Sequence, residues 1–132
     1  MSITTPDLLL EQEGLLPGAS CYVDIGKLQW KPAPWPGIEQ KVLMHDSETG
    51  MVTVLLRMAP GSCIPLHHHT AIEQTYVLEG SLVDDEGAAT AGNFVWRPAN
   101  GHEHIARAPK GALVLSFLIR PNAYRDNSPH YA

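Results

Sequence analysis

Charge is scarce in this 132-residue chain, which sets nine Lys and Arg residues against fourteen Asp and Glu residues. With no basic cluster it lacks the patch that neutralises phosphates, so we expect no nucleic-acid partner. No apolar run approaches the roughly 18 residues that a membrane-spanning helix needs. Residues 1–13 lack the basic segment and the long apolar stretch of a signal peptide. We therefore expect a cytoplasmic protein that binds no membrane.

Cysteine is rarer still, and the two present, Cys21 and Cys63, form no CxxC pair. We expect both to be free thiols that pack as small buried apolar residues. The chain has eleven Gly and eleven Pro residues, which excludes a long coiled coil. Its hydrophobic fraction of 44% is too high for a disordered chain. The length fits one domain.

From residue 38 onward, short apolar segments alternate with Gly, Pro and Asp turns, which is typical of a β-sandwich or barrel. A short helix is expected over residues 6–13, because Thr5-Pro6-Asp7 resembles a helix start. We predict an N-terminal arm or short helix over 1–20, a β-barrel over 21–125 and a C-terminal tail over 126–132. The predicted strands are 38–45, 51–58, 63–69, 72–78, 81–84, 94–97, 102–107 and 112–119.

Histidine is the exception to this modest inventory, since five of the seven fall in the windows 67–69 and 102–104. Side chains alternate faces along a strand, so His67 and His69 share a face that His68 does not. Glu73 follows four residues after His69, and His102 or His104 can supply a third imidazole. Imidazoles with a carboxylate suit a divalent transition metal.

The spacing of these residues resembles the two signatures of the cupin superfamily. The first matches at each of its positions, as Gly61-x5-His67-x-His69-x3-Glu73-x6-Gly80. The second matches with one extra residue between Pro98 and Gly101, as Gly92-x5-Pro98-x2-Gly101-x2-His104, and Ala108 stands where the family often has Asn.

This resemblance implies an all-β fold, a single cupin β-barrel (jelly roll), with one divalent metal ion inside it. The positions that match the family's ligands are His67, His69, Glu73 and His104. Glu73 is either a ligand or a residue that orients a ligand histidine, and it is the one candidate for acid–base catalysis. His102 competes with His104 for the third imidazole position. Fe(II) is the favoured metal, with Zn(II), Ni(II), Mn(II) and Cu(II) as alternatives.

The segments 45–50 and 57–62 resemble small single-domain cupins. These include the β-diketone (acetylacetone) cleaving dioxygenases, the 2,4′-dihydroxyacetophenone dioxygenases and the cupin part of zinc-binding anti-sigma factors. Strand parity places Cys63, Thr75 and Val77 toward the cavity. It puts Phe94 and Trp96 on one shared face, where they belong to the core or to the cavity wall, and we favour the core. Because no cluster of Lys, Arg or Asp surrounds the signatures, we expect a small substrate that is mostly apolar or aromatic.

Our leading hypothesis is a non-haem Fe(II) dioxygenase that uses O2 to cleave a C–C bond in a small diketone or hydroxyketone. Two alternatives are a zinc-binding sensor or regulatory module and an oxygen-independent, metal-dependent isomerase or hydrolase. We also expect a homodimer, since a small barrel leaves open sheet edges. Trp30 and Trp35 either form its contact or fold back over their own barrel.

Overall fold

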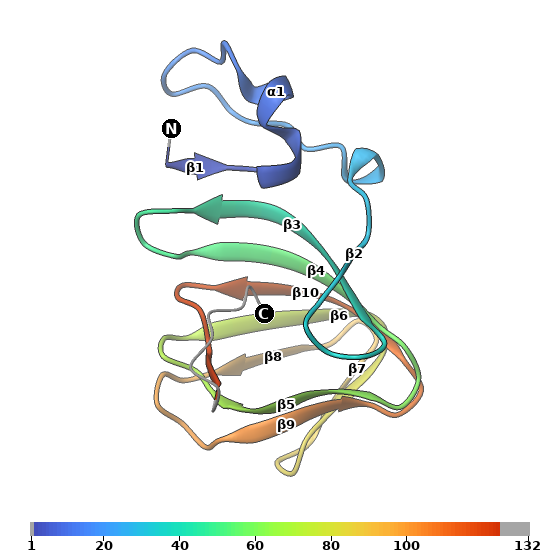
Figure 1. Cartoon of the computed structure of the whole chain (residues 1–132). Coiled ribbons are helices and arrows are strands. Elements are labelled where there is room, and N and C mark those ends of the chain that lie inside the picture. Colours follow the sequence, from blue (N-terminus) through green and yellow to red (C-terminus); the bar gives the residue numbers. More distant parts are fainter. Residues whose placement is uncertain (1, 125–132) are drawn as a thin grey trace.

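The described part of the chain, residues 2–124 of a computed structural model, consists mainly of antiparallel strands (Figure 1). Its eleven strands form one sheet in the order β1-β3-β4-β10-β6-β9-β5-β11, with β2 on β3 and with β7 and β8 on β6. This arrangement confirms the predicted all-β class. The strands are β1 (Ile3–Thr4), β2 (Lys31–Pro32), β3 (Ile38–Asp46), β4 (Val52–Met58), β5 (Ser62–His68), β6 (Glu73–Val83), β7 (Ala88–Thr90), β8 (Phe94–Arg97), β9 (His104–Ala108), β10 (Ala112–Leu118) and β11 (Ala123–Tyr124).

The sheet curls because the long strand β6 belongs to both of its layers (Figure 1). Residues 73–76 of β6 pair with β8, whereas residues 81–83 pair with β7. Gly80 lies between these parts with φ +71°, and a Cβ there would overlap the carbonyl oxygen of Gly111. The predicted break between strands 72–78 and 81–84 is therefore a bend in one strand, because glycine adopts this backbone conformation without ending the ladder.

Apolar side chains from both layers fill the inside of the curl. Thr75 and Val77 point inward, as expected from parity. Fully burying a Val or Leu side chain contributes roughly 1.5–3 kcal/mol, so this cluster is the main source of stability. The largest fully buried apolar side chains are Leu118, Val52, Val54, Val77 and Val114.

The N-terminal arm lies along the edge strand β3 and covers it (Figure 1). It holds two 3-10 turns, η1 (Pro6–Leu8) and η2 (Ile25–Lys27), and one short helix, α1 (Leu9–Gln12). Both β1 and β2 pair with β3 of the same chain. None of the helices among the described residues is long and apolar enough to cross a membrane. The boundary at residue 20 stays a prediction, and the predicted tail 126–132 lies outside the described residues.

The two arm tryptophans pack against their own barrel. Trp35 is buried in the core, with its ring centroid 5.3 Å from that of Tyr124. Trp30 lies under two cations, 4.8 Å from Lys41 Nζ and 4.2 Å from Arg57 Cζ. Of the two alternatives for these side chains, the structure therefore shows the fold-back.

Two expectations about side-chain direction are wrong. Cys63 is exposed, and so is Cys21. The register of β5 on β9 shifts between Ile64 and His67, so counting faces back from His67 gives the wrong side for Cys63. Phe94 and Trp96 are 51% and 58% exposed, since β8 turns its alternate positions inward instead.

Replacing Gly80 tests the bend in β6. Gly80→Ala is expected to lower the free energy of unfolding by about 3 kcal/mol or more. Alanine is strained at this φ, and its Cβ would also overlap the backbone of Gly111. Gly61→Ala is the matched control, since Gly61 has φ +82° with no atom within 4 Å of an added Cβ. It should cost about 1 kcal/mol. Urea unfolding measures both, and equal losses would contradict the close approach at Gly80.

Candidate metal centre

Three histidines meet inside the curled sheet. His67 on β5 pairs across the ladder with His104 on β9, and His69 follows immediately after β5 ends. Each is buried, with 4%, 2% and 6% exposure for His67, His69 and His104. One ligand nitrogen from each lies within 4.8 Å of the others. The pairing of β5 with β9 therefore brings the two histidine windows of the sequence together.

Each of the three rings has a hydrogen-bond acceptor at Nδ1. His67 Nδ1 lies 2.7 Å from the Pro65 carbonyl oxygen, and His104 Nδ1 lies 2.9 Å from Asp84 Oδ2. His69 Nδ1 lies 2.8 Å from Asn122 Oδ1 and 3.0 Å from Glu73 Oε2. A carbonyl oxygen or a carboxylate only accepts, so each Nδ1 carries the proton and donates it. The lone pair of each neutral ring is then on Nε2.

Two of these lone pairs face each other. His69 Nε2 and His104 Nε2 are 2.9 Å apart, a distance at which two unprotonated nitrogens repel unless a cation lies between them. Imidazole nitrogens, held at Nδ1 by outer acceptors, are the usual setting of a divalent transition metal. The three histidines can therefore hold a metal ion, and they are three of the four positions that the cupin resemblance implies as ligands.

Burial and nearby charge favour the neutral form of His67 and His104. Burial is the main cause that lowers the pKa of His67. Burial, followed by the positive charge of Arg97, lowers the pKa of His104 to about 4. A neutral imidazole is the form that binds metal, so the surroundings favour that form near neutral pH.

Glu73 lies behind His69. Burial opposes its ionisation, but the hydrogen bond and charge of His69, together with the amide of Asn122, lower its pKa to about 2. Asn122 Nδ2 donates to Glu73 Oε2 at 3.0 Å, and Thr75 Oγ1 donates to Oε1 at 3.2 Å. In this geometry Glu73 contacts the Nδ1 side of His69, and it is not part of the three-histidine group.

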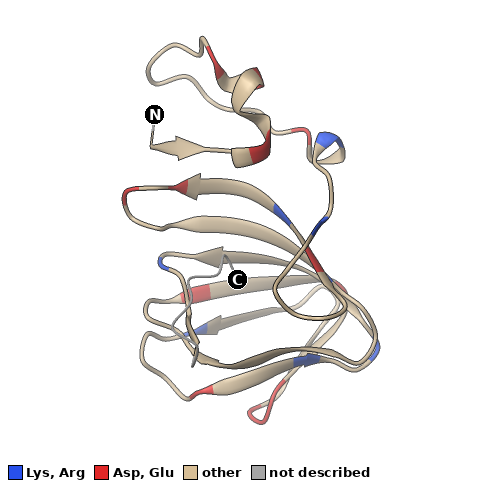
Figure 2. Ribbon diagram, viewed as in Figure 1, with Lys and Arg blue, Asp and Glu red and all other residues tan. Residues whose placement is uncertain are grey.

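Asp84 and Arg97 complete the surroundings of His104, and neither was expected from the sequence. Asp84 lies at the acidic tip of the β6–β7 hairpin, which is coloured red in Figure 2. Burial raises its pKa, but the backbone N–H of Glu86 and the charge of Arg97 outweigh burial and lower it. Asp84 Oδ2 accepts from Arg97 Nη1 at 2.7 Å as well as from His104.

Strand register explains why Arg97 points into the barrel. It pairs directly with Glu73 across β6 and β8, and cross-strand partners share a face. Glu73 belongs to the first signature and was expected to point inward. Its partner across the two strands would then also be expected to point inward, and that partner is Arg97. Asn122 follows β10 in a loop and carried no signal in the sequence.

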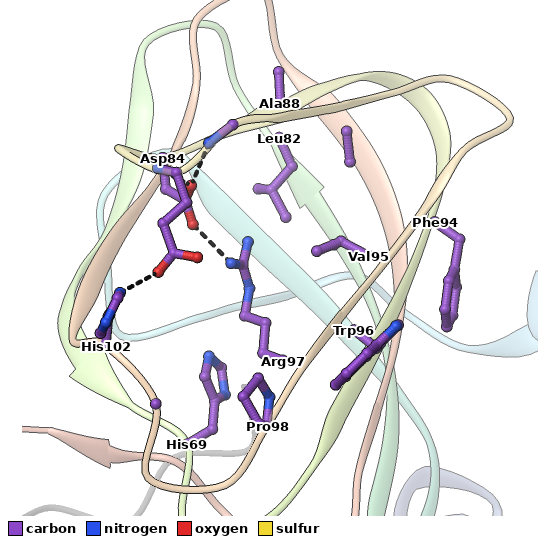
Figure 3. Close-up of a pocket in the computed structure, with 14 residues that line it drawn as sticks. His69, Leu82, Asp84, Ala88, Phe94, Val95, Trp96, Arg97, Pro98 and His102 are labelled. Atoms are coloured by element: carbon purple, nitrogen blue, oxygen red, sulfur yellow. Dashed lines mark hydrogen bonds and ion pairs between the residues drawn. The ribbon is translucent and has the colours of Figure 1, made fainter.

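Two cavities adjoin the centre. A small interior chamber of about 20 Å³ is lined in part by His67, Glu73 and His104. An open cleft of about 430 Å³ lies outside it and is lined in part by His69 (Figure 3). Leu82 and Arg97 line both spaces, so they form the boundary between the cleft and the chamber.

His102 lies away from the three-histidine group. Its side chain is 85% exposed, and its Nδ1 lies 3.0 Å from Glu86 Oε1 at the rim of the cleft (Figure 3). His104, two residues further along, is the histidine of this window that meets His67 and His69.

Comparison with known proteins agrees with this architecture. The sequence model of the family described as ChrR Cupin-like domain matches residues 19–119. No curated protein matches the sequence.

Several solved structures share the fold. A candidate acetylacetone dioxygenase from Methylibium petroleiphilum PM1 is 23% identical, with TM-score 0.74 over 84% of this chain and 85% of that one. An acetylacetone dioxygenase from Acinetobacter johnsonii is 19% identical, with TM-score 0.74 over 88% and 86%. Rhodobacter sphaeroides SigE in complex with the anti-sigma ChrR matches at 23% identity and TM-score 0.60, over 72% of this chain and 50% of that one. At such identities the likeness shows the fold alone.

Single substitutions test the three histidines. His67→Ala, His69→Ala and His104→Ala are each expected to weaken Zn(II) binding by more than about 100-fold, beyond what loss of an outer partner costs. His102→Ala is the matched control and should keep wild-type affinity, because its ring lies outside the group. Titration against a chelator of known affinity, with metal content by mass spectrometry, measures the effect. A loss in His102→Ala but not in His104→Ala would contradict the assignment.

Proposed function

The chain belongs to the family of ChrR cupin-like domains, and from this premise we propose that it is a metal-dependent dioxygenase. The proposed reaction cleaves a C–C bond in a small diketone or hydroxyketone with O2, at a metal held by His67, His69 and His104. The observation that carries the proposal is the set of three buried imidazoles whose ligand nitrogens lie within 4.8 Å of one another beside an open cleft. Three protein ligands leave coordination positions for substrate oxygens.

Fe(II) is the metal we favour, and Zn(II), Ni(II), Mn(II) and Cu(II) are the alternatives. When bound, Fe(II) supplies Lewis acidity toward the carbonyl oxygens of the substrate and electrons for the reaction with O2. Structural likeness to two proteins named as acetylacetone dioxygenases or candidates for that activity supports this choice of reaction.

The side chains of this protein have three tasks in the proposed reaction. Asp84, Asn122 and Glu73 hold the Nδ1–H groups of His104 and His69, which fixes the direction of each ring. Leu82 and Val95 give the cleft apolar walls that receive the substrate body and exclude water. Glu73 acts as an orienting residue here, because its carboxylate is ionised and its oxygens are engaged.

A zinc-binding regulatory module is the second candidate. Its support is the family description itself and the likeness to a chain in the complex of SigE with ChrR. A module of this kind would keep its metal against chelators and would consume no oxygen. The third alternative, an isomerase or hydrolase, would convert its substrate without oxygen.

Oxygen uptake separates these functions. The metal-free protein is reconstituted with Fe(II) under nitrogen, mixed with acetylacetone or 2,4′-dihydroxyacetophenone, and exposed to a measured amount of oxygen. We expect substrate-dependent uptake that His69→Ala abolishes and His102→Ala keeps. Absence of uptake with each of the five metals would overturn the dioxygenase proposal, and product formed under nitrogen would favour the isomerase or hydrolase.

We also propose that the protein is a homodimer, formed through the outer face of β6, β8 and β10. Tyr76 pairs with Phe94 across two strands, and Trp96 and Phe117 flank Gln74 on the same face. At their partial exposure these aromatic side chains, with Leu78, present on the order of 500 Å² of apolar surface. A patch of that size is close to the ~600 Å² per partner that small stable interfaces bury, and an apolar face is complementary to its own copy.

Sedimentation velocity tests the dimer. Trp96→Lys is expected to give a monomer at concentrations where the wild type is dimeric, because a charge on the apolar face is desolvated on association. Leu10→Lys is the control, since Leu10 is more exposed than Trp96, at 78% against 58%, but lies on the N-terminal arm. A monomeric wild type, or a dimer lost only in Leu10→Lys, would contradict this interface.

A further inference from the structure

Arg97 stands between the cleft and the three-histidine centre. It lies at the end of β8 and lines both the 430 Å³ cleft and the small inner chamber. Its side chain is 14% exposed, and it reaches across the cleft toward Asp84 (Figure 3). Trp96, the residue before it, points to the outside of the sheet. His69 lines the same cleft, so a molecule bound there can lie against both the guanidinium and a histidine of the centre.

Most of the hydrogen-bonding capacity of Arg97 is unused within the described residues. A guanidinium carries five N–H donors in one plane. Within residues 2–124, one hydrogen bond is found for it, from Nη1 to Asp84 Oδ2 at 2.7 Å. Asp84 in turn accepts from His104 and from two backbone N–H groups, so the carboxylate that holds Arg97 is fully engaged. Asp84 thus fixes the direction of Arg97 and leaves its other donors for a ligand.

With a divalent ion bound, the charges around the centre would balance only with one more negative group. Within the described part of the chain, Glu73 and Asp84 are the acidic side chains within hydrogen-bond distance of the three-histidine group. A divalent ion at the histidines and Arg97 would together carry three positive charges against these two negative ones. Buried charge that is not compensated is costly, so a ligand with a single negative charge would complete the balance.

We propose that Arg97 is a specificity-determining residue that binds the carboxylate of the substrate. The planar donors of arginine match the two oxygens of a carboxylate, and the single charge matches the balance above. The rest of the nearby wall includes Leu82, Ala89 and Val95, which suits an apolar or aryl body. The preferred substrate is thus a small ketone of the proposed class that also carries a carboxylate and an apolar group. This inference depends on the proposed function only for the metal at the three histidines.

Paired probes test the charge preference directly. Benzoylformate carries a carboxylate beside its ketone, and 1-phenyl-1,2-propanedione has a neutral acetyl group in the same place. Both are titrated by calorimetry into the Co(II)-loaded protein under nitrogen, where no reaction with oxygen competes. We expect benzoylformate to bind at least about tenfold more tightly than the dione.

Variants assign that preference to Arg97. Arg97→Gln is expected to lose about tenfold or more in benzoylformate affinity with little change for the dione, and Arg97→Lys should lose less because it keeps the charge. Arg107→Gln is the matched control, since Arg107 also pairs with an aspartate, Asp85 at 3.7 Å, but lines neither cavity. Metal content and far-ultraviolet circular dichroism, measured for each variant, report whether the centre and fold are retained.

Three results would overturn the proposal. These are no binding of benzoylformate to the wild type, equal binding of both probes, and an equal loss for both probes in Arg97→Gln. If Arg97→Gln does not fold or loads no Co(II), Arg97→Lys decides, and an unchanged preference in it would also count against the planar contact. Selective binding without oxygen uptake would reject the dioxygenase while keeping the role of Arg97, so the two proposals fail independently.

Discussion

The structure depends on one constraint, which is that three imidazoles are buried in an apolar barrel and each needs hydrogen-bond partners there. A buried polar group without a partner is costly, and each of these rings has two nitrogens to satisfy. The protein supplies acceptors at Nδ1 from a backbone carbonyl, an amide and two carboxylates. That choice leaves Nε2 of His69 and of His104 opposite each other, with a nitrogen of His67 close by, so the same hydrogen bonds that make burial tolerable also create a centre that can accept a cation.

The remaining parts of the fold position these partners. The bend of β6 at Gly80 lets one strand carry Glu73 in one layer and lead to Asp84 beyond the other. The pairing of β6 with β8 then sets Arg97 opposite Glu73. As a result, the carboxylates that contact His69 and His104 lie at the start of β6 and just beyond its end, and Arg97 lies near both at the edge of the cleft.

Alternation along strands predicted much of this arrangement. The eight predicted strands lie close to observed ones, and the histidine pair at 67 and 69 was correctly placed on one inward face. The same rule failed for Cys63, because a register shift separates it from His67. The core position favoured for Phe94 and Trp96 was also wrong, because both side chains are exposed. Alternation along a strand shows that it has two different faces. The strands with which it pairs then determine which face lies inside the barrel.

The amino-acid sequence alone was enough to predict the all-β class, the turns at glycine and the candidate metal ligands His67, His69 and His104. These properties depend on local backbone preference and on short-range periodicity, which neighbouring residues define. It took the tertiary structure to show that His104, and not His102, meets His67 and His69, that Glu73 lies on the Nδ1 side of His69, and that Asp84, Arg97 and Asn122 lie at the centre. The hydrogen bonds of Asp84, Arg97 and Asn122 join residues 13 to 53 positions apart, and their geometry depends on strand register and on the curl of the sheet, which no local pattern encodes.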